Sequence, residues 1–156
     1  MDGTEKNDLH RAYAGLLEDI RRAEVRAAEL FHDLAIVAAD ETVASVFRAT
    51  AAESSIQLAR VDRLIHSNGN AVLGAAATGN GSVPAGTRAG DADLLDAARD
   101  SVHHQMELYE AACVTSRRLG DLAALDVLLL NLDEERSAAA ALNWQVSRQG
   151  SVLRAI

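Results

Sequence analysis

The stretch that decides the fold runs from Asp91 to Val146 and reads DADLLDAARDSVHHQMELYEAACVTSRRLGDLAALDVLLLNLDEERSAAAALNWQV. Apolar residues recur in it at steps of three and four, on one stripe before Gly120-Asp121 and on another after it. This spacing is typical of a helix with one apolar face. Because a Gly-Asp pair favours a tight turn, the stretch predicts two long antiparallel helices, over 91–119 and 121–148.

The first half of the chain repeats this arrangement. Apolar stripes predict one helix over about 8–39 and a second over about 40–66, followed by Asn68-Gly69 as a helix stop. Residues 70–90 show no period and hold the only proline and half of the ten glycines, so we interpret them as a flexible connection. Two hairpins joined in this way predict a single all-α domain over 1–156, a ferritin-like antiparallel four-helix bundle with one long crossover connection.

Composition excludes several classes of protein. With 49% hydrophobic and 24% charged residues, the chain has too much apolar surface for a disordered protein. Aromatic residues make up only 3%, so the core has to be built from Ala, Leu, Val and Ile. The apolar runs are far shorter than the roughly 20 residues that cross a bilayer, which argues against a membrane protein.

Charge and cysteine content point to a cytoplasmic protein that does not bind nucleic acid. The net charge is −8, and the paired arginines are too scattered to form the basic patch that nucleic-acid binding needs. The single cysteine, Cys113, has no partner for an internal disulfide, and the polar N-terminus lacks the apolar region of a secretory signal. We therefore expect the chain to reside in the cytoplasm.

Polar residues that interrupt the apolar stripes are the candidate site. Glu24, Glu53 and Glu135 each fall on the expected inward face near the middle of a helix, and Gln105 holds the matching position on the remaining helix. Buried carboxylates are paired, protonated or bound to metal, and iron or manganese suits their hard oxygens. Two alternatives stay open: Glu24 pairs with an arginine, or a shift of one position turns Glu134 inward in place of Glu135.

His103 is a further candidate metal ligand, because it lies beside the inward stripe of its helix. A histidine on a helix flank is, however, more commonly exposed or hydrogen-bonded than a ligand. The sequence contains no P-loop, GxGxxG, HExxH or CxxC motif. It therefore assigns no catalytic residue and leaves open whether the protein is an enzyme.

Four segments carry a resemblance to a known family: LEDIRRAE (17–24), AAESSIQLARVDRL (51–64), DADLLDAARDSVHHQMELY (91–109) and LGDLAALDVLLLNLDEE (119–135). They resemble the YciE/YciF family of ferritin-like proteins, whose motifs are close to LxDIYxAE, LEETxxQxxR, EHYE and LLxxTLDEEKxTD. The resemblance covers about three quarters of the chain. It implies a dimeric four-helix bundle from a bacterial stress-linked group that is associated with di-metal binding.

The resemblance also assigns residues. Those that match family motif positions are Glu24, Glu53, Gln57, His103, Tyr109, Glu134 and Glu135. The departures are Val102 and Gln105 in place of two glutamates on the third helix, Ala52 in place of a glutamate, and Ala139 in place of an aspartate. Because each lost carboxylate removes charge that would offset two metal ions, the departures make a full di-metal site doubtful.

These observations favour a ferritin-like, stress-associated homodimer with a degenerate core carboxylate site and weak or no di-metal binding. One alternative is a functional oxidoreductase-like protein that binds iron or manganese through Glu24, Glu53 and Glu135, with Gln105 or His103 assisting. The other is a helical module that binds a partner through the glycine-rich segment. The sequence names neither a substrate nor a physiological trigger.

Overall fold

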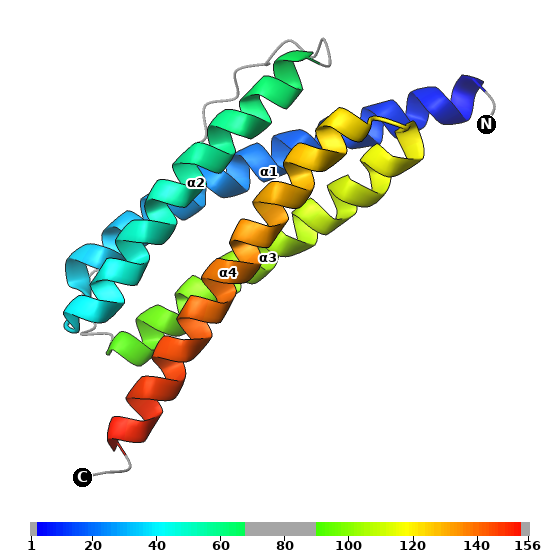
Figure 1. Ribbon diagram of the computed structural model, residues 1–156. Coiled ribbons are helices and arrows are strands. Elements are labelled where there is room, and N and C mark those ends of the chain that lie inside the picture. The colour runs from blue at the N-terminus through cyan, green and yellow to red at the C-terminus, as the bar shows by residue number, and fades with distance from the viewer. Residues whose placement is uncertain (1–2, 68–89, 154–156) are drawn as a thin grey trace.

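The protein is described here by a computed structural model of residues 3–67 and 90–153, with side chains up to residue 150. These residues form four helices and no strand. The helices are α1 (Gly3–Val37), α2 (Glu41–Ser67), α3 (Asp91–Leu119) and α4 (Leu122–Leu153) (Figure 1). The predicted all-α bundle is thereby confirmed. None of the described helices is long and apolar enough to span a membrane.

The helices pair as two antiparallel hairpins, α1 with α2 and α3 with α4 (Figure 1). The start of α3 lies beside the start of α2, because the Asp91 carboxylate accepts the backbone N–H groups of Ala39 (2.9 Å) and Asp40 (2.8 Å). Helices α2 and α3 therefore run in the same direction. The predicted flexibility of 70–90 concerns residues that, apart from Gly90, lie outside the described ones.

Helix ends follow local chemistry. Gly120 adopts the left-handed conformation with φ of 75°, which a glycine tolerates without a Cβ clash, and its N–H donates to the Arg117 carbonyl over 3.1 Å. Asp121 then accepts the N–H of Ala124 over 3.0 Å and caps α4. The predicted turn is confirmed, whereas α1 begins at Gly3, about five residues earlier than expected, since residues 3–7 contain no proline to stop it.

The apolar core is divided into two clusters along the bundle. One cluster contains Tyr13, Leu17 and Ile20 of α1, and the other contains Phe31 of α1 and Phe47 of α2, whose ring centroids are 6.1 Å apart. Between the two clusters, each of the four helices buries polar side chains. Those side chains make up the candidate site.

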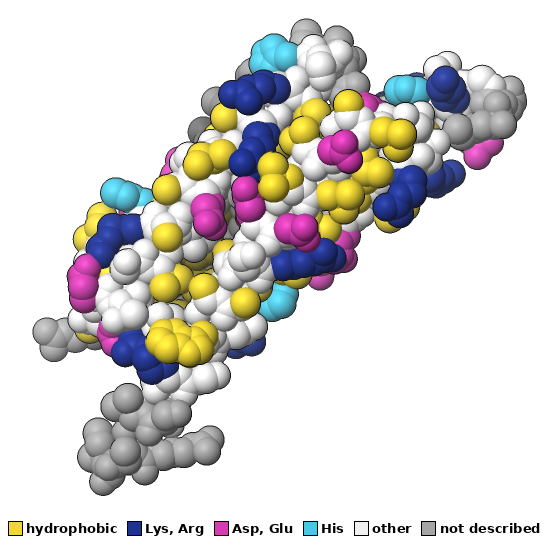
Figure 2. Space-filling model, in the orientation of Figure 1, with side chains coloured by type: hydrophobic (Ala, Val, Ile, Leu, Met, Phe, Trp, Pro, Cys, Tyr) yellow, Lys and Arg dark blue, Asp and Glu magenta, His cyan; other side chains and the backbone are white. Residues whose placement is uncertain are grey.

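The surface over α2 and α4 mixes apolar and charged side chains (Figure 2). Large apolar residues exposed on these two helices include Ile56, Leu122, Leu130 and Trp144. The Arg148 guanidinium lies 5.9 Å from the centre of the Trp144 ring and also donates to Asp40 over 2.7 Å. This last contact ties the C-terminal part of α4 to the link between α1 and α2.

Candidate functional site: a polar layer in the bundle core

A polar layer crosses the middle of the bundle, with side chains from all four helices. Its members are at most 2% exposed, and they are Glu24, Ser54, Gln57, Gln105, Tyr109, Asn131 and Glu135. They stand at steps of three and four from the apolar core residues of their own helices, so the helical repeat that buries the core also buries them.

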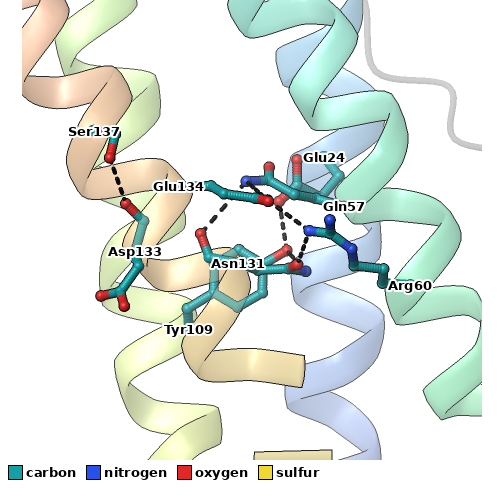
Figure 3. Close-up of polar contacts among 8 residues, drawn as sticks. All are labelled: Glu24, Gln57, Arg60, Tyr109, Asn131, Asp133, Glu134 and Ser137. Atoms are coloured by element: carbon teal, nitrogen blue, oxygen red, sulfur yellow. Dashed lines mark hydrogen bonds and ion pairs between the residues drawn. The ribbon is translucent and has the colours of Figure 1, made fainter. Parts of the chain in front are cut away.

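Glu24 is held by a chain of donors. Gln105 Nε2 donates to its Oε2 atom over 2.8 Å, and the Tyr109 hydroxyl donates to its Oε1 atom over 2.6 Å. Asn131 Nδ2 donates in turn to the Tyr109 oxygen over 3.0 Å (Figure 3). Burial raises the pKa of Glu24 to about 7, although the hydrogen bonds from Tyr109 and Gln105 oppose that rise.

An ion pair closes the side of the layer between α2 and α4. Arg60 Nη1 donates to Glu134 Oε2 over 2.6 Å and to Asn131 Oδ1 over 2.8 Å (Figure 3). Gln57 Nε2 donates to the same Glu134 oxygen over 3.2 Å. The Arg60 and Glu134 side chains are 24% and 28% exposed, so this pair stands at the boundary between the layer and solvent.

Glu135 is the least satisfied carboxyl of the layer. Its Oε2 atom has no hydrogen-bond partner among the described residues. Burial and the negative charge of Glu24 together raise the pKa of Glu135 to about 8, against a smaller lowering by the Gln57 side chain. At neutral pH the Glu135 carboxyl is therefore mainly protonated in the absence of a cation.

The structure places the predicted residues as follows. Glu24, Gln105 and Glu135 lie in the polar layer, as expected. The alternative in which Glu134 points inward in place of Glu135 is wrong, because Glu134 is half-buried and paired with Arg60. His103 is exposed on α3, as is common for a histidine on a helix flank, and the structure does not bring it into the layer. It lies one position past Val102, and a step of one residue rotates a side chain by about 100° on a helix.

The inward placement predicted for Glu53 is also wrong, since Glu53 is exposed and Ser54 is buried in its place. Glu53 and Ser54 stand about equally far to either side of the line from Thr50 to Gln57, so that line alone does not choose between them. Desolvation and the negative charge of Glu134 raise the pKa of the Glu53 carboxyl.

Sequence reasoning missed Ser54, Asn131 and Arg60. A signal for Ser54 was available, because the buried positions 43, 47, 50, 54, 57, 61 and 64 of α2 alternate steps of four and three throughout. A signal for Asn131 was also available. It lies four residues before Glu135, so the two side chains share one face of a helix. Arg60 stands at the final arginine of the family motif LEETxxQxxR, but its role could not be foreseen, since it depends on a partner on α4.

The donor set of the polar layer does not fit a di-metal centre. Ferritin-like di-metal sites use about four carboxylates and two histidines. The layer buries two carboxylates and no histidine, and among the described residues no group of three or more His, Cys, Asp or Glu side chains is arranged to hold a metal ion. Two carboxylates offset the charge of one divalent ion, whereas two ions would leave uncompensated positive charge in a buried layer.

Four helices, one crossover connection and a carboxylate-containing layer at mid-height define a ferritin-like four-helix bundle. The chain belongs to the family described as Domain of unknown function (DUF892), whose sequence model matches residues 8–150. Its fold is similar to the crystal structure of the E. coli stress protein YciF, with a TM-score of 0.76 and 20% sequence identity over 92% of this chain and 97% of that chain. The expected family is thus confirmed. No curated protein sequence matches the chain.

Proposed function

We propose that the chain is a stress-associated ferritin-like protein whose core site is degenerate and does not carry out di-metal oxidation chemistry. The observation that carries the proposal is the content of the polar layer. Within the described part of the chain, the buried carboxylates are Glu24 and Glu135, and the layer's other side chains include the amide or hydroxyl groups of Ser54, Gln57 and Gln105. Such a layer functions as a hydrogen-bonded structural element of the bundle.

The stress association is supported by the likeness in fold to the E. coli stress protein YciF. It is tested in a strain that lacks this chain, by measuring survival under a panel of stresses. The parent chain and the Glu24→Gln variant should restore survival equally, because a structural layer needs the shape of the side chain rather than its charge. Failure of the parent to restore survival would contradict the stress association, and failure of the variant alone would argue for a chemical role of Glu24.

The alternative of an iron- or manganese-dependent oxidoreductase has weaker support. It needs several carboxylates that converge on open coordination positions, but Glu53 is exposed and Glu134 is occupied by Arg60. A partner-binding role of the glycine-rich segment concerns residues outside the described ones.

Metal analysis tests the absence of di-metal chemistry directly. Protein from cells grown with added iron and manganese should contain no more than one metal ion per chain and should not turn over peroxide. Two ions per chain together with peroxide turnover would overturn the proposal. As a control, the same analysis on the Glu24→Gln variant separates ions bound in the layer from ions bound at the acidic surface.

We further propose that the protein forms a homodimer in the cytoplasm. The exposed apolar side chains of α2 and α4, with Ile56 and Leu130 among them, support a face for a second copy. The lone, buried thiol of Cys113 is compatible with a reducing compartment. Light scattering at micromolar concentration should give the mass of a dimer, and Leu130→Asp should shift that mass toward the monomer. A monomeric mass for the parent chain would contradict the dimer.

A further inference from the structure

A cavity outside the polar layer lies at the end of the bundle where the two hairpins meet (Figure 1). It has a volume of about 600 Å³ and is partly open to solvent. Its walls come from the α1–α2 link, the start of α3 and the last turns of α4, and they include Ala39, Ala92, Arg148 and Gln149. Sites for small organic molecules have volumes of about 300–1,000 Å³ and mainly apolar walls with a few polar groups. This cavity has both properties.

The two carboxylates in the cavity wall already hold the hairpins together. The oxygens of Asp91 accept the backbone N–H groups of Ala39 and Asp40. Asp40 Oδ1 accepts the N–H of Thr42 over 2.7 Å, and Asp40 Oδ2 accepts Nη2 of Arg148 over 2.7 Å. The hydrogen bond from Arg148 also keeps the pKa of Asp40 below its ordinary value. All four carboxylate oxygens are therefore engaged, and neither acid is left for a cationic ligand.

Arg148 is the charged group of the wall that retains hydrogen-bonding capacity. A guanidinium carries five N–H donors in a planar fork. The Nε atom of Arg148 donates to Gln145 over 3.0 Å, and its Nη2 atom donates to Asp40. Neither contact uses Nη1, so this nitrogen can donate to an oxygen atom in the cavity. The two contacts fix the orientation of the guanidinium, and the side chain is 31% exposed, so a ligand can reach it.

These features select the chemistry of the ligand. A guanidinium forms short, charge-assisted hydrogen bonds with a carboxylate group. Ala39, Ala92 and the methylene groups of Arg148 and Gln149 offer apolar surface to a hydrocarbon chain. A molecule that combines an anionic oxygen group with a short hydrocarbon part matches both kinds of wall.

We propose that this cavity binds a small organic carboxylate. The anionic group of the ligand pairs with Arg148, and its hydrocarbon part lies against Ala39 and Ala92. The site is separate from the polar layer, so it goes beyond the proposed function and does not depend on it.

Trp144 provides a reporter next to this site. It is the single tryptophan of the chain, and the centre of its ring lies 5.9 Å from the Arg148 guanidinium. A ligand that takes up the guanidinium alters the surroundings of the ring. Binding should therefore change the tryptophan fluorescence.

The test titrates the full chain with hexanoate, hexylamine and hexanol, which share one hydrocarbon chain and differ in charge. Binding is followed by tryptophan fluorescence and by isothermal titration calorimetry at constant ionic strength. We expect hexanoate to bind at one saturable site per chain, at least about tenfold more tightly than either of the others. The net charge of −8 makes this a strict test, because unspecific attraction would favour the amine.

Variants assign the binding to Arg148. Arg148→Gln should weaken hexanoate binding at least about tenfold, since it removes the cation and keeps a side chain of similar length. Asp40→Asn breaks the same ion pair but keeps the guanidinium, and asparagine still caps α2, so this variant should bind hexanoate as tightly as the parent or more tightly. The control is Arg136→Gln, which removes one positive charge from α4 at a side chain that is 51% exposed, and it should leave binding unchanged.

Each other outcome overturns the inference. Equal binding of hexanol or hexylamine would mean that no anion site exists, and unchanged binding by Arg148→Gln would place hexanoate elsewhere. Equal losses in Asp40→Asn and Arg148→Gln would mean that Arg148 only supports the wall of the cavity, and an equal loss in Arg136→Gln would mean that overall charge is responsible. Circular dichroism checks that the helices of each variant are intact. If Arg148→Gln unfolds, the three probes and Asp40→Asn still decide the question.

Discussion

Replacing Glu135 with Gln should change how the stability of the metal-free protein depends on pH. Burial raises the pKa of Glu135 from an ordinary 4.5 to about 8. Between these two values the folded state binds more protons than the unfolded state, so the free energy of unfolding falls as pH rises. The contribution is fully present below about pH 4.5 and is lost as pH rises through about 8. Glutamine resembles the protonated acid in shape and does not titrate, so the variant escapes this loss.

The size of the effect follows from the pKa shift. A shift from 4.5 to about 8 is roughly 3.5 units, and at about 1.36 kcal/mol per unit the full span is about 5 kcal/mol. About 4 kcal/mol of this falls between about pH 5 and about pH 9. Relative to the parent chain, Glu135→Gln should therefore be within about 1 kcal/mol at the acidic end and about 4 kcal/mol more stable at the alkaline end.

The assay is urea denaturation followed by circular dichroism, with a chelator present at every pH. Asp133→Asn serves as the control, because it makes the same carboxylate-to-amide change on α4 at a side chain that is 73% exposed. Unfolding free energies of parent and Glu135→Gln that run parallel from acid to alkaline pH would refute the reasoning, since Glu135 would then titrate as an exposed acid does.

Three further substitutions probe single contacts. Tyr109→Phe removes the hydroxyl that donates to Glu24 over 2.6 Å, and it should lower the unfolding free energy at about pH 6 by about 1–3 kcal/mol in urea denaturation; an unchanged value would contradict the contact. Asp91→Ala removes the acceptor of two backbone N–H groups in the α1–α2 link, and hydrogen exchange at those amides should accelerate, whereas Asp91→Asn should retain part of the protection. Gly120→Ala introduces a Cβ at φ of 75° and should lower the unfolding free energy by about 1 kcal/mol; a rise in melting temperature would mean that the turn rearranges.

The fold and half of the site were predictable because the apolar stripes are nearly continuous. Glu24 follows Ile20 by four residues and precedes Ala27 by three, so a helix that buries both neighbours has to bury Glu24 as well. The same reasoning fails at Glu53 and Ser54. At about 100° per residue, each of these two lies about 50° from the line that joins Thr50 and Gln57, so the choice between them needs the alternation of four- and three-residue steps along the whole of α2.

The contacts within the layer could not be predicted from one sequence. The pairing of Arg60 with Glu134 and the donation from Tyr109 to Glu24 join residues that lie more than 70 positions apart in the chain. Such pairs depend on how far each helix is rotated and raised against the next, which the apolar stripes restrict only coarsely.

The division of the core by a polar layer has a consequence for how the helices align. Faces rich in Ala and Leu resemble one another from turn to turn, so they could pack nearly as well after sliding by one turn, about 5.4 Å. If α4 slid in this way, Asn131 would lose the Tyr109 hydroxyl and Glu135 would move against the apolar side chains of an adjoining cluster. Burying a carboxyl there without a partner is costly. The polar layer thus fixes the axial register of the four helices. This structural role would preserve its polar residues even in a protein without a catalytic metal.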